Sequence, residues 1–162
     1  MTARPAFEPW GRFLAQNARW LSAGALLTLL SSFGQTFFIS LFAAEVQAEF
    51  ALSHGDWGMI YALGTMASAA VMIWAGGLTD RWRARSLGML VLALLALSCL
   101  AMALNPFSLM LPVIIFALRL TGQGMTSHIA VVAMSRWFVA TRGRALSIAT
   151  LGFSVGEAVL PI

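Results

Sequence analysis

The stretch Gly76-Gly77-Leu78-Thr79-Asp80-Arg81-Trp82-Arg83-Ala84-Arg85 decides how this chain folds. Its charged part, residues 80–85, lies between two long runs, residues 57–79 and 86–104, in which no residue is charged. An α-helix needs about 20 apolar residues to cross the hydrocarbon layer of a membrane. The two runs therefore predict two transmembrane helices joined by a short charged loop.

Three more runs extend the same pattern along the chain, at residues 20–44, 107–135 and 145–162. The turn-forming pair Asn105-Pro106 separates the third run of the chain from the fourth. We predict an all-α membrane protein with five transmembrane helices in one membrane domain, preceded by a cytoplasmic segment at residues 1–19. Because the last run ends the sequence without a polar tail, we interpret the chain as the front part of a longer protein.

The arginines predict which side of the membrane each loop occupies. Short loops rich in arginine stay on the cytoplasmic side, so the N-terminus is predicted to be inside. The protein is then a multi-pass protein whose first partner is the lipid bilayer, and we expect it in a bacterial inner membrane. Nine of the ten basic residues fall into three stretches that alternate with the runs: Arg4, Arg12 and Arg19; Arg81, Arg83 and Arg85; Arg136, Arg142 and Arg144.

The composition excludes other classes of protein. The chain is 60% hydrophobic and 10% charged, whereas roughly a quarter of the residues in soluble domains are charged. The arginines are spread over three loops rather than gathered on one polar surface, which argues against a nucleic-acid partner. The single cysteine, Cys99, supports neither a disulfide framework nor a metal site, and we expect no cofactor.

Two charged residues interrupt the apolar runs, and they predict a functional site. Arg119 and Glu157 lie about 24 Å and about 18 Å from the cytoplasmic side, at 1.5 Å per helical residue, and Gln35 lies at about 22 Å. A charge at such depth must face the protein interior, a partner or water. We predict that these three side chains line one polar cavity near the midplane, where carriers bind their substrates.

Glu157 could take up or release a proton as its contact with Arg119 changes, which makes protons a predicted partner. A static salt bridge that only holds helices together is the alternative. His128 is nine residues from Arg119, about 180° around an α-helix, so we expect it to point away from that cavity and to have a packing role. Its neighbour Ser127 diverges from it by about 100° and cannot pair with it as nucleophile and base, so we expect no enzyme activity.

The loop at residues 76–85 resembles the signature loop between the second and third helices of the major facilitator superfamily, with Gly76, Asp80, Arg81 and Arg85 on matching positions. The resemblance implies that this loop holds the two halves of a transporter together on the cytoplasmic side. Arg119 followed by Gln123-Gly124 is similar to the family's helix 4 motif, in which the arginine is associated with proton coupling or the substrate cavity. Gln123 is therefore a further candidate.

The resemblance implies a twelve-helix fold of two six-helix halves, of which this chain would be the incomplete first, lacking C-terminal helices of the same protein. It also implies a secondary active or facilitative transporter that moves a small solute by alternating access, without metal or cofactor. The order Gly152, Gly156, Pro161 in the last run is similar to the monocarboxylate and oxalate/formate branch. Small residues four apart also permit close helix crossing, and Pro161 permits a bend.

Within this interpretation the solute is an organic anion, such as a monocarboxylate, that pairs with Arg119 and crosses the membrane in symport with protons. A cationic drug would instead pair with Glu157, as in a drug/proton antiporter of the same superfamily. A membrane scaffold or assembly protein, which only docks partners, is the alternative outside transport. The isolated 162-residue chain is expected not to transport by itself, because one wall of the cavity would be missing.

Overall fold

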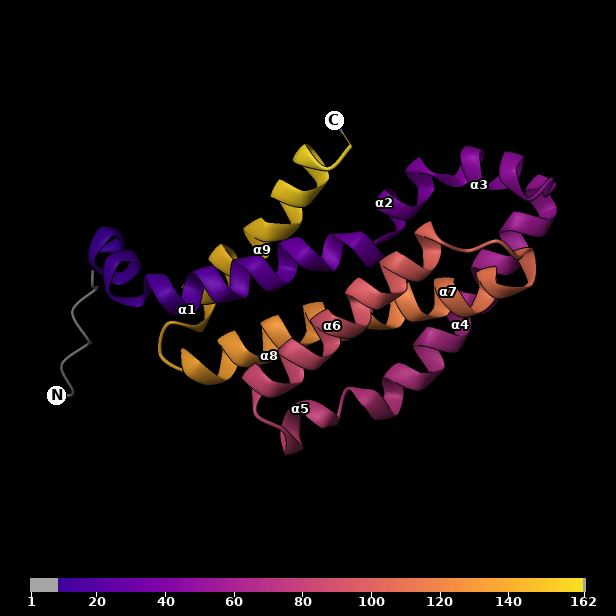
Figure 1. The fold of residues 1–162 in the computed structure, drawn as a ribbon. Coiled ribbons are helices and arrows are strands. Elements are labelled where there is room, and N and C mark those ends of the chain that lie inside the picture. The colour runs from indigo at the N-terminus through magenta and orange to yellow at the C-terminus, as the bar shows by residue number, and fades with distance from the viewer. Residues whose placement is uncertain (1–8, 162) are drawn as a thin grey trace, which may run out of the picture.

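The computed structural model describes residues 9–161, and every regular element in that part of the chain is helical (Figure 1). The long helices pack side by side along one direction. A 3-10 turn follows α1, another precedes α7, and a π-helix joins α7 to α8. The α-helices are α1 (Trp10–Ser31), α2 (Thr36–Leu41), α3 (Ala43–Glu49), α4 (His54–Ala75), α5 (Leu78–Arg81), α6 (Ala84–Ala103), α7 (Leu111–Leu118), α8 (Ser127–Trp137) and α9 (Arg142–Val159).

Four helical stretches in the described residues are long and apolar enough to cross a membrane: Trp10–Leu41, His54–Arg81, Ala84–Ala103 and Ser108–Trp137. They coincide with the first four predicted runs, which confirms the membrane class of the protein. The fifth run is also helical, as α9, but α9 is not one of these four stretches. Its crossing of the membrane therefore stays a prediction.

The outer faces of the bundle are apolar. Ile73 and Trp74 on α4 are 76% and 73% exposed, and Leu97 on α6 is 60% exposed. A soluble protein rarely leaves so many large apolar side chains uncovered. These faces suit contact with lipid chains.

The first helix begins at Trp10, about ten residues before the predicted run. The absence of charge was the criterion for that run, and it missed an amphipathic start in which Arg12 is exposed while Phe13 is only 2% exposed. Phe13 packs edge-to-face on Phe138, which follows α8. Part of the predicted cytoplasmic segment at residues 1–19 is thus helical, and residues 1–8 lie outside the described part of the chain.

The first span is interrupted at its middle. A 3-10 turn at Ser32–Gly34 follows α1, and Gln35 then adopts an extended backbone before α2 begins. The turn lies against the fourth span so closely that a Cβ on Gly34 would collide with the carbonyl of Leu118 and with Gly122. Only glycine permits this approach of two backbones.

A second close crossing joins α1 to α9, which run beside each other (Figure 1). Gly152 lies against Ala25 and Thr28, and Gly156 lies against Ser32. The Thr28 hydroxyl, fully buried, donates to the carbonyl of Ala149 at 2.5 Å. Pro161 lies two residues beyond the end of α9, where a residue that cannot continue a helix is common.

The fourth span contains a π-helix from Arg119 to Thr126, here called the π segment. Its wide turn is visible in the hydrogen bond from the Thr126 hydroxyl to the carbonyl of Thr121, five residues earlier, at 2.6 Å. π-helical turns are rare and are frequently found at functional sites. The π segment carries Arg119, Gln123 and Gly124, which are the residues of the predicted helix 4 motif.

Candidate functional site

A pocket of about 500 Å³ lies between α4, the fourth span and α9. Helix α4 contributes one face, because Thr65, Ser68, Ala69 and Met72 follow the three- and four-residue spacing of an α-helix. The remaining lining residues come from the π segment, from α8 and from one residue of α9: Arg119, Gln123, Gly124, Ser127, His128, Val131 and Phe153.

Arg119 is the charged group of this pocket, and its side chain is held from the side of the first span. It is 9% exposed. One guanidinium nitrogen donates to the Thr36 hydroxyl at 3.0 Å and to the Gly34 carbonyl at 3.4 Å. The guanidinium carbon lies 5.5 Å from the centre of the Tyr61 ring, a distance at which a cation is attracted to the face of an aromatic ring.

The polar atoms that line the pocket are incompletely paired. Nε of Arg119, Oε1 of Gln123 and Oγ1 of Thr65 are buried, and none of the three has a hydrogen-bond partner in the structure. Buried polar atoms are nearly always paired, so each orphan calls for an explanation such as a ligand or water. All three residues line the pocket, which places incompletely paired polar side chains beside a space large enough for a small polar solute.

His128 lines the same pocket as Arg119, so the prediction that it points to the opposite side of the helix is wrong. The prediction assumed 100° per residue throughout, as in an α-helix. Each turn of the π segment takes in an extra residue, so position 128 comes back toward the side of Arg119. The Ser127 hydroxyl, which donates to the carbonyls of Gln123 and Gly124, satisfies backbone acceptors in the same segment.

The other two predicted cavity residues do not line this pocket. Glu157 is exposed on α9, one turn beyond the lining residue Phe153, and it forms no ion pair with Arg119. Gln35 is half-buried at the break in the first span, where its backbone amide donates to the carbonyl of Ser32. The structure therefore brings Arg119 and Gln123 into one pocket; Gln35, which stands between the two Arg119 acceptors Gly34 and Thr36, and Glu157 are not among its lining residues.

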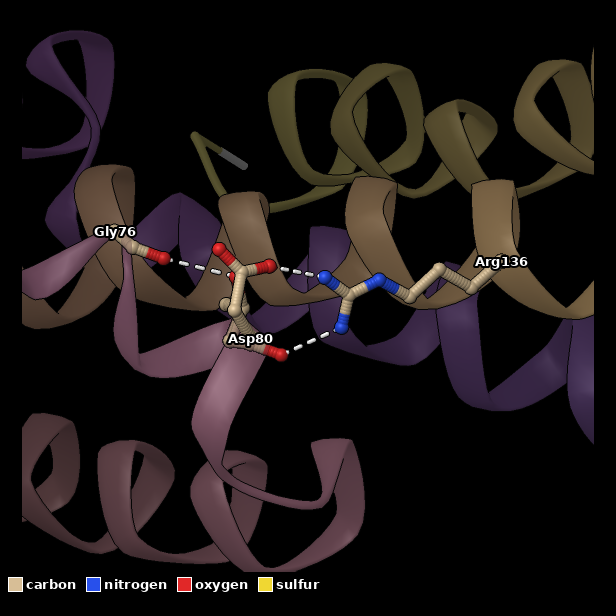
Figure 2. A network of polar contacts seen from close by, with 4 residues as sticks. Gly76, Asp80 and Arg136 are labelled. Carbon is tan, nitrogen blue, oxygen red and sulfur yellow. Dashed lines mark hydrogen bonds and ion pairs between the residues drawn. The ribbon is translucent and has the colours of Figure 1, made fainter.

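The predicted signature loop forms a second polar network just beyond the C-terminal end of α4 (Figure 2). The carboxylate of Asp80 forms an ion pair with the guanidinium of Arg136 on α8. Arg136 also donates to the carbonyl of Thr79 at 2.6 Å, and the Thr79 hydroxyl donates to the carbonyl of Gly76 at 2.8 Å. The carboxylate thus reaches across to another helix. Arg81 and Arg85 are exposed.

Sequence reasoning did not assign Thr36, Tyr61, Thr65 or Arg136 to these sites. Arg136 was visible as a member of the third basic stretch, and Tyr61 as the sole tyrosine in the chain, on an otherwise apolar run. Nothing in the sequence distinguished Thr36 and Thr65 from the other small polar residues of the helices. Within residues 9–161, no three His, Cys, Asp or Glu side chains gather closely enough to hold a metal ion.

Four apolar helices of spanning length, and a pocket beside a buried and incompletely paired arginine, define an integral membrane protein with a solute-sized cavity. The sequence model of the family described as Major Facilitator Superfamily matches residues 24–162. The chain belongs to this superfamily, whose members are membrane transporters. No curated protein and no solved structure matches it at a significant level. The match gives no support to the narrower monocarboxylate or oxalate/formate branch.

Proposed function

We propose that this protein carries a small organic anion across the membrane by alternating access, in symport with protons. The observation that carries the proposal is Arg119, whose guanidinium is nine-tenths buried in a pocket of about 500 Å³ and keeps Nε unpaired. An arginine cannot discharge itself, so a buried guanidinium without a carboxylate needs another source of negative charge. A bound carboxylate supplies that charge.

The chemistry of the pocket favours an anion over a cation. Among the residues that line it there is no aspartate or glutamate, and Arg119 is its one permanent charge. Gln123 and Thr65 add neutral polar groups that can orient a carboxylate or a hydroxyl. A cationic drug would meet a like charge at this place, so the drug/proton antiporter is the weaker candidate. A scaffold would have no use for unpaired polar atoms in a cavity.

The proposal includes a position for the proton. Glu157 is the acidic residue predicted within the fifth run, and it follows the pocket residue Phe153 by one turn on α9. A carboxyl at that place can exchange a proton with an open cavity while Arg119 holds the substrate. We place the arginine-rich loops, including Arg81 and Arg142, on the cytoplasmic side of a bacterial inner membrane.

Uptake of labelled organic anions by cells that express the complete reading frame tests the proposal. We expect saturable uptake that rises as the outside pH falls, and we expect Arg119→Ala to abolish it. Arg12→Ala is the matched control, because Arg12 is exposed on α1 and does not line the pocket. Uptake of organic anions that Arg119→Ala leaves unchanged would refute the assignment of Arg119. Loss of proton dependence in Glu157→Gln, with anion exchange retained, is the result expected for the proton site.

A further inference from the structure

The pocket has a second polar end, formed by His128. Its imidazole lines the cavity and forms no hydrogen bond or ion pair with residues 9–161. The ring nitrogen Nε2 lies 3.7 Å from the position that a Cβ of Gly76 would occupy, so this end of the pocket adjoins the start of the signature loop. An imidazole donates a hydrogen bond when neutral and is a cation when protonated, so it can bind an anionic oxygen in either state.

The two ends are separated by the length of the pocket. Nine residues along a helix axis correspond to at most about 13 Å, and the stripe from Thr65 to Met72 on α4 extends over about 10 Å of the same wall. The wall is mixed: Ala69, Met72 and Phe153 are apolar, Ser68 and Ser127 add hydroxyl groups, and Val131 lies one turn beyond His128. A small monocarboxylate bound at Arg119 would leave His128 and the middle of the pocket unfilled.

We propose that the substrate is an elongated dianion, with one carboxylate at Arg119 and a second carboxylate at His128 joined by a short hydrocarbon chain. The inference rests on the proposed function and specifies the substrate class of the same site. Gln123 and Thr65 lie at the Arg119 end, where their unpaired atoms meet the first carboxylate and its neighbouring atoms. The apolar side chains of Ala69, Met72 and Phe153 contact the hydrocarbon middle.

No other group of the described chain competes for the second carboxylate. Helix α4 and helix α9 contribute no titratable side chain to the pocket, and α1 and α6, which also pack on the fourth span, contribute no lining residue. Arg136 of the same helix α8 is engaged with Asp80 and Thr79. His128 is therefore the residue that sets the preference for a second anionic end.

Calorimetric titration of the protein expressed from the complete reading frame and purified in lipid nanodiscs tests the inference, with empty nanodiscs as the control for partition into lipid. The probes are two matched homologous series, the dicarboxylates from succinate to suberate and the monocarboxylates from butyrate to octanoate. We expect one length of dicarboxylate to bind about tenfold more tightly than the matched monocarboxylate, as one charge-assisted hydrogen bond would give.

Three variants separate the two ends. In His128→Leu the preference for the dicarboxylate over the matched monocarboxylate should fall to about one. His128→Gln, which keeps a donor, should retain part of the preference. In Arg119→Leu both series should lose binding.

The outcomes distinguish the inference from the proposed function. If monocarboxylates bind through Arg119 and a second carboxylate adds nothing at any length, the dianion is refuted and the anion carrier stands. The same follows if the dicarboxylate preference survives in His128→Leu. If neither series binds, or if Arg119→Leu binds both as the wild type does, the proposed function fails together with the inference.

Discussion

The pocket around Arg119 and the loop at Asp80 are both built from arginines and small polar residues, yet they differ in how completely their polar groups are paired. In the loop, Arg136 reaches a carboxylate and a backbone carbonyl, and Thr79 bonds to Gly76. In the pocket, Arg119 and Gln123 each keep a buried atom without a partner. A network complete within the chain holds structure together, whereas an incomplete one leaves room for a ligand.

The largest difference between the two regions should appear in Arg119→Leu. We expect its affinity for organic anions to fall about a hundredfold, because charge-assisted hydrogen bonds to the ligand are lost. The temperature of unfolding should change little, since removing a buried unpaired charge offsets the loss of the bonds to Thr36 and Gly34. Both quantities are measurable on one sample, by calorimetry and by the reaction of a thiol dye with Cys99, the single cysteine, which is half-buried.

A variant that binds anions normally, or that unfolds far more easily than the wild type, would contradict this prediction. The first result would show that the orphan atoms do not mark a binding site. The second would show that Arg119 serves mainly to stabilise the fold.

The next effect concerns the backbone contact that supports the pocket. A Cβ added at Gly122 would collide with the backbone of Gly34, so Gly122→Ala should lower the free energy of unfolding by about 2 kcal/mol. Gly143→Ala is the matched control, because a Cβ there meets nothing within 4 Å and alanine favours the helix. Dye reaction at Cys99 on heating measures both variants. Equal unfolding temperatures in the two would show that the spans are not locked together at this crossing.

The smallest effect is expected in the loop. The side chains of Arg136 and Asp80 are 51% and 68% exposed, and a pair so exposed stabilises a protein by at most about 1 kcal/mol. Arg136→Leu should therefore leave anion affinity within about twofold of the wild type while speeding amide hydrogen exchange at Leu78–Arg81. Exchange that stays unchanged there would mean that the loop is ordered by other contacts. A large loss of anion affinity would show that the loop and the pocket act together as one binding site.

The sequence predicted the features that depend on composition along the chain. Apolar runs of spanning length, the alternation of basic loops and the burial of Arg119 follow from the cost of placing charge in hydrocarbon. The start of α1 was missed because an amphipathic turn with Arg12 outside and Phe13 inside contains a charge and so fails a criterion of uncharged length. The error concerns the residue at which the first helix begins, whereas the helix itself was predicted.

The pocket was harder to predict because it depends on contacts between spans. The π segment is not encoded by helix propensity, which is similar for α- and π-turns of the same residues. It coincides with the close crossing of Gly34 and Gly122, which are 88 positions apart in the chain. The position of His128 followed from that segment and was mispredicted for the same reason. Thr36 and Tyr61 became partners of Arg119 through the same crossing of the first, second and fourth spans.

The wide turns between Arg119 and Thr126 determine the direction in which each later side chain of the fourth span points from the helix axis. Each residue that such a turn absorbs displaces the later side chains by about 100° around the axis. If the segment relaxed to ordinary α-helical winding, His128 would swing out of the cavity and Arg136 would leave Asp80 in the same rotation. The winding of this one segment therefore sets the positions of both the pocket residue His128 and the loop partner Arg136.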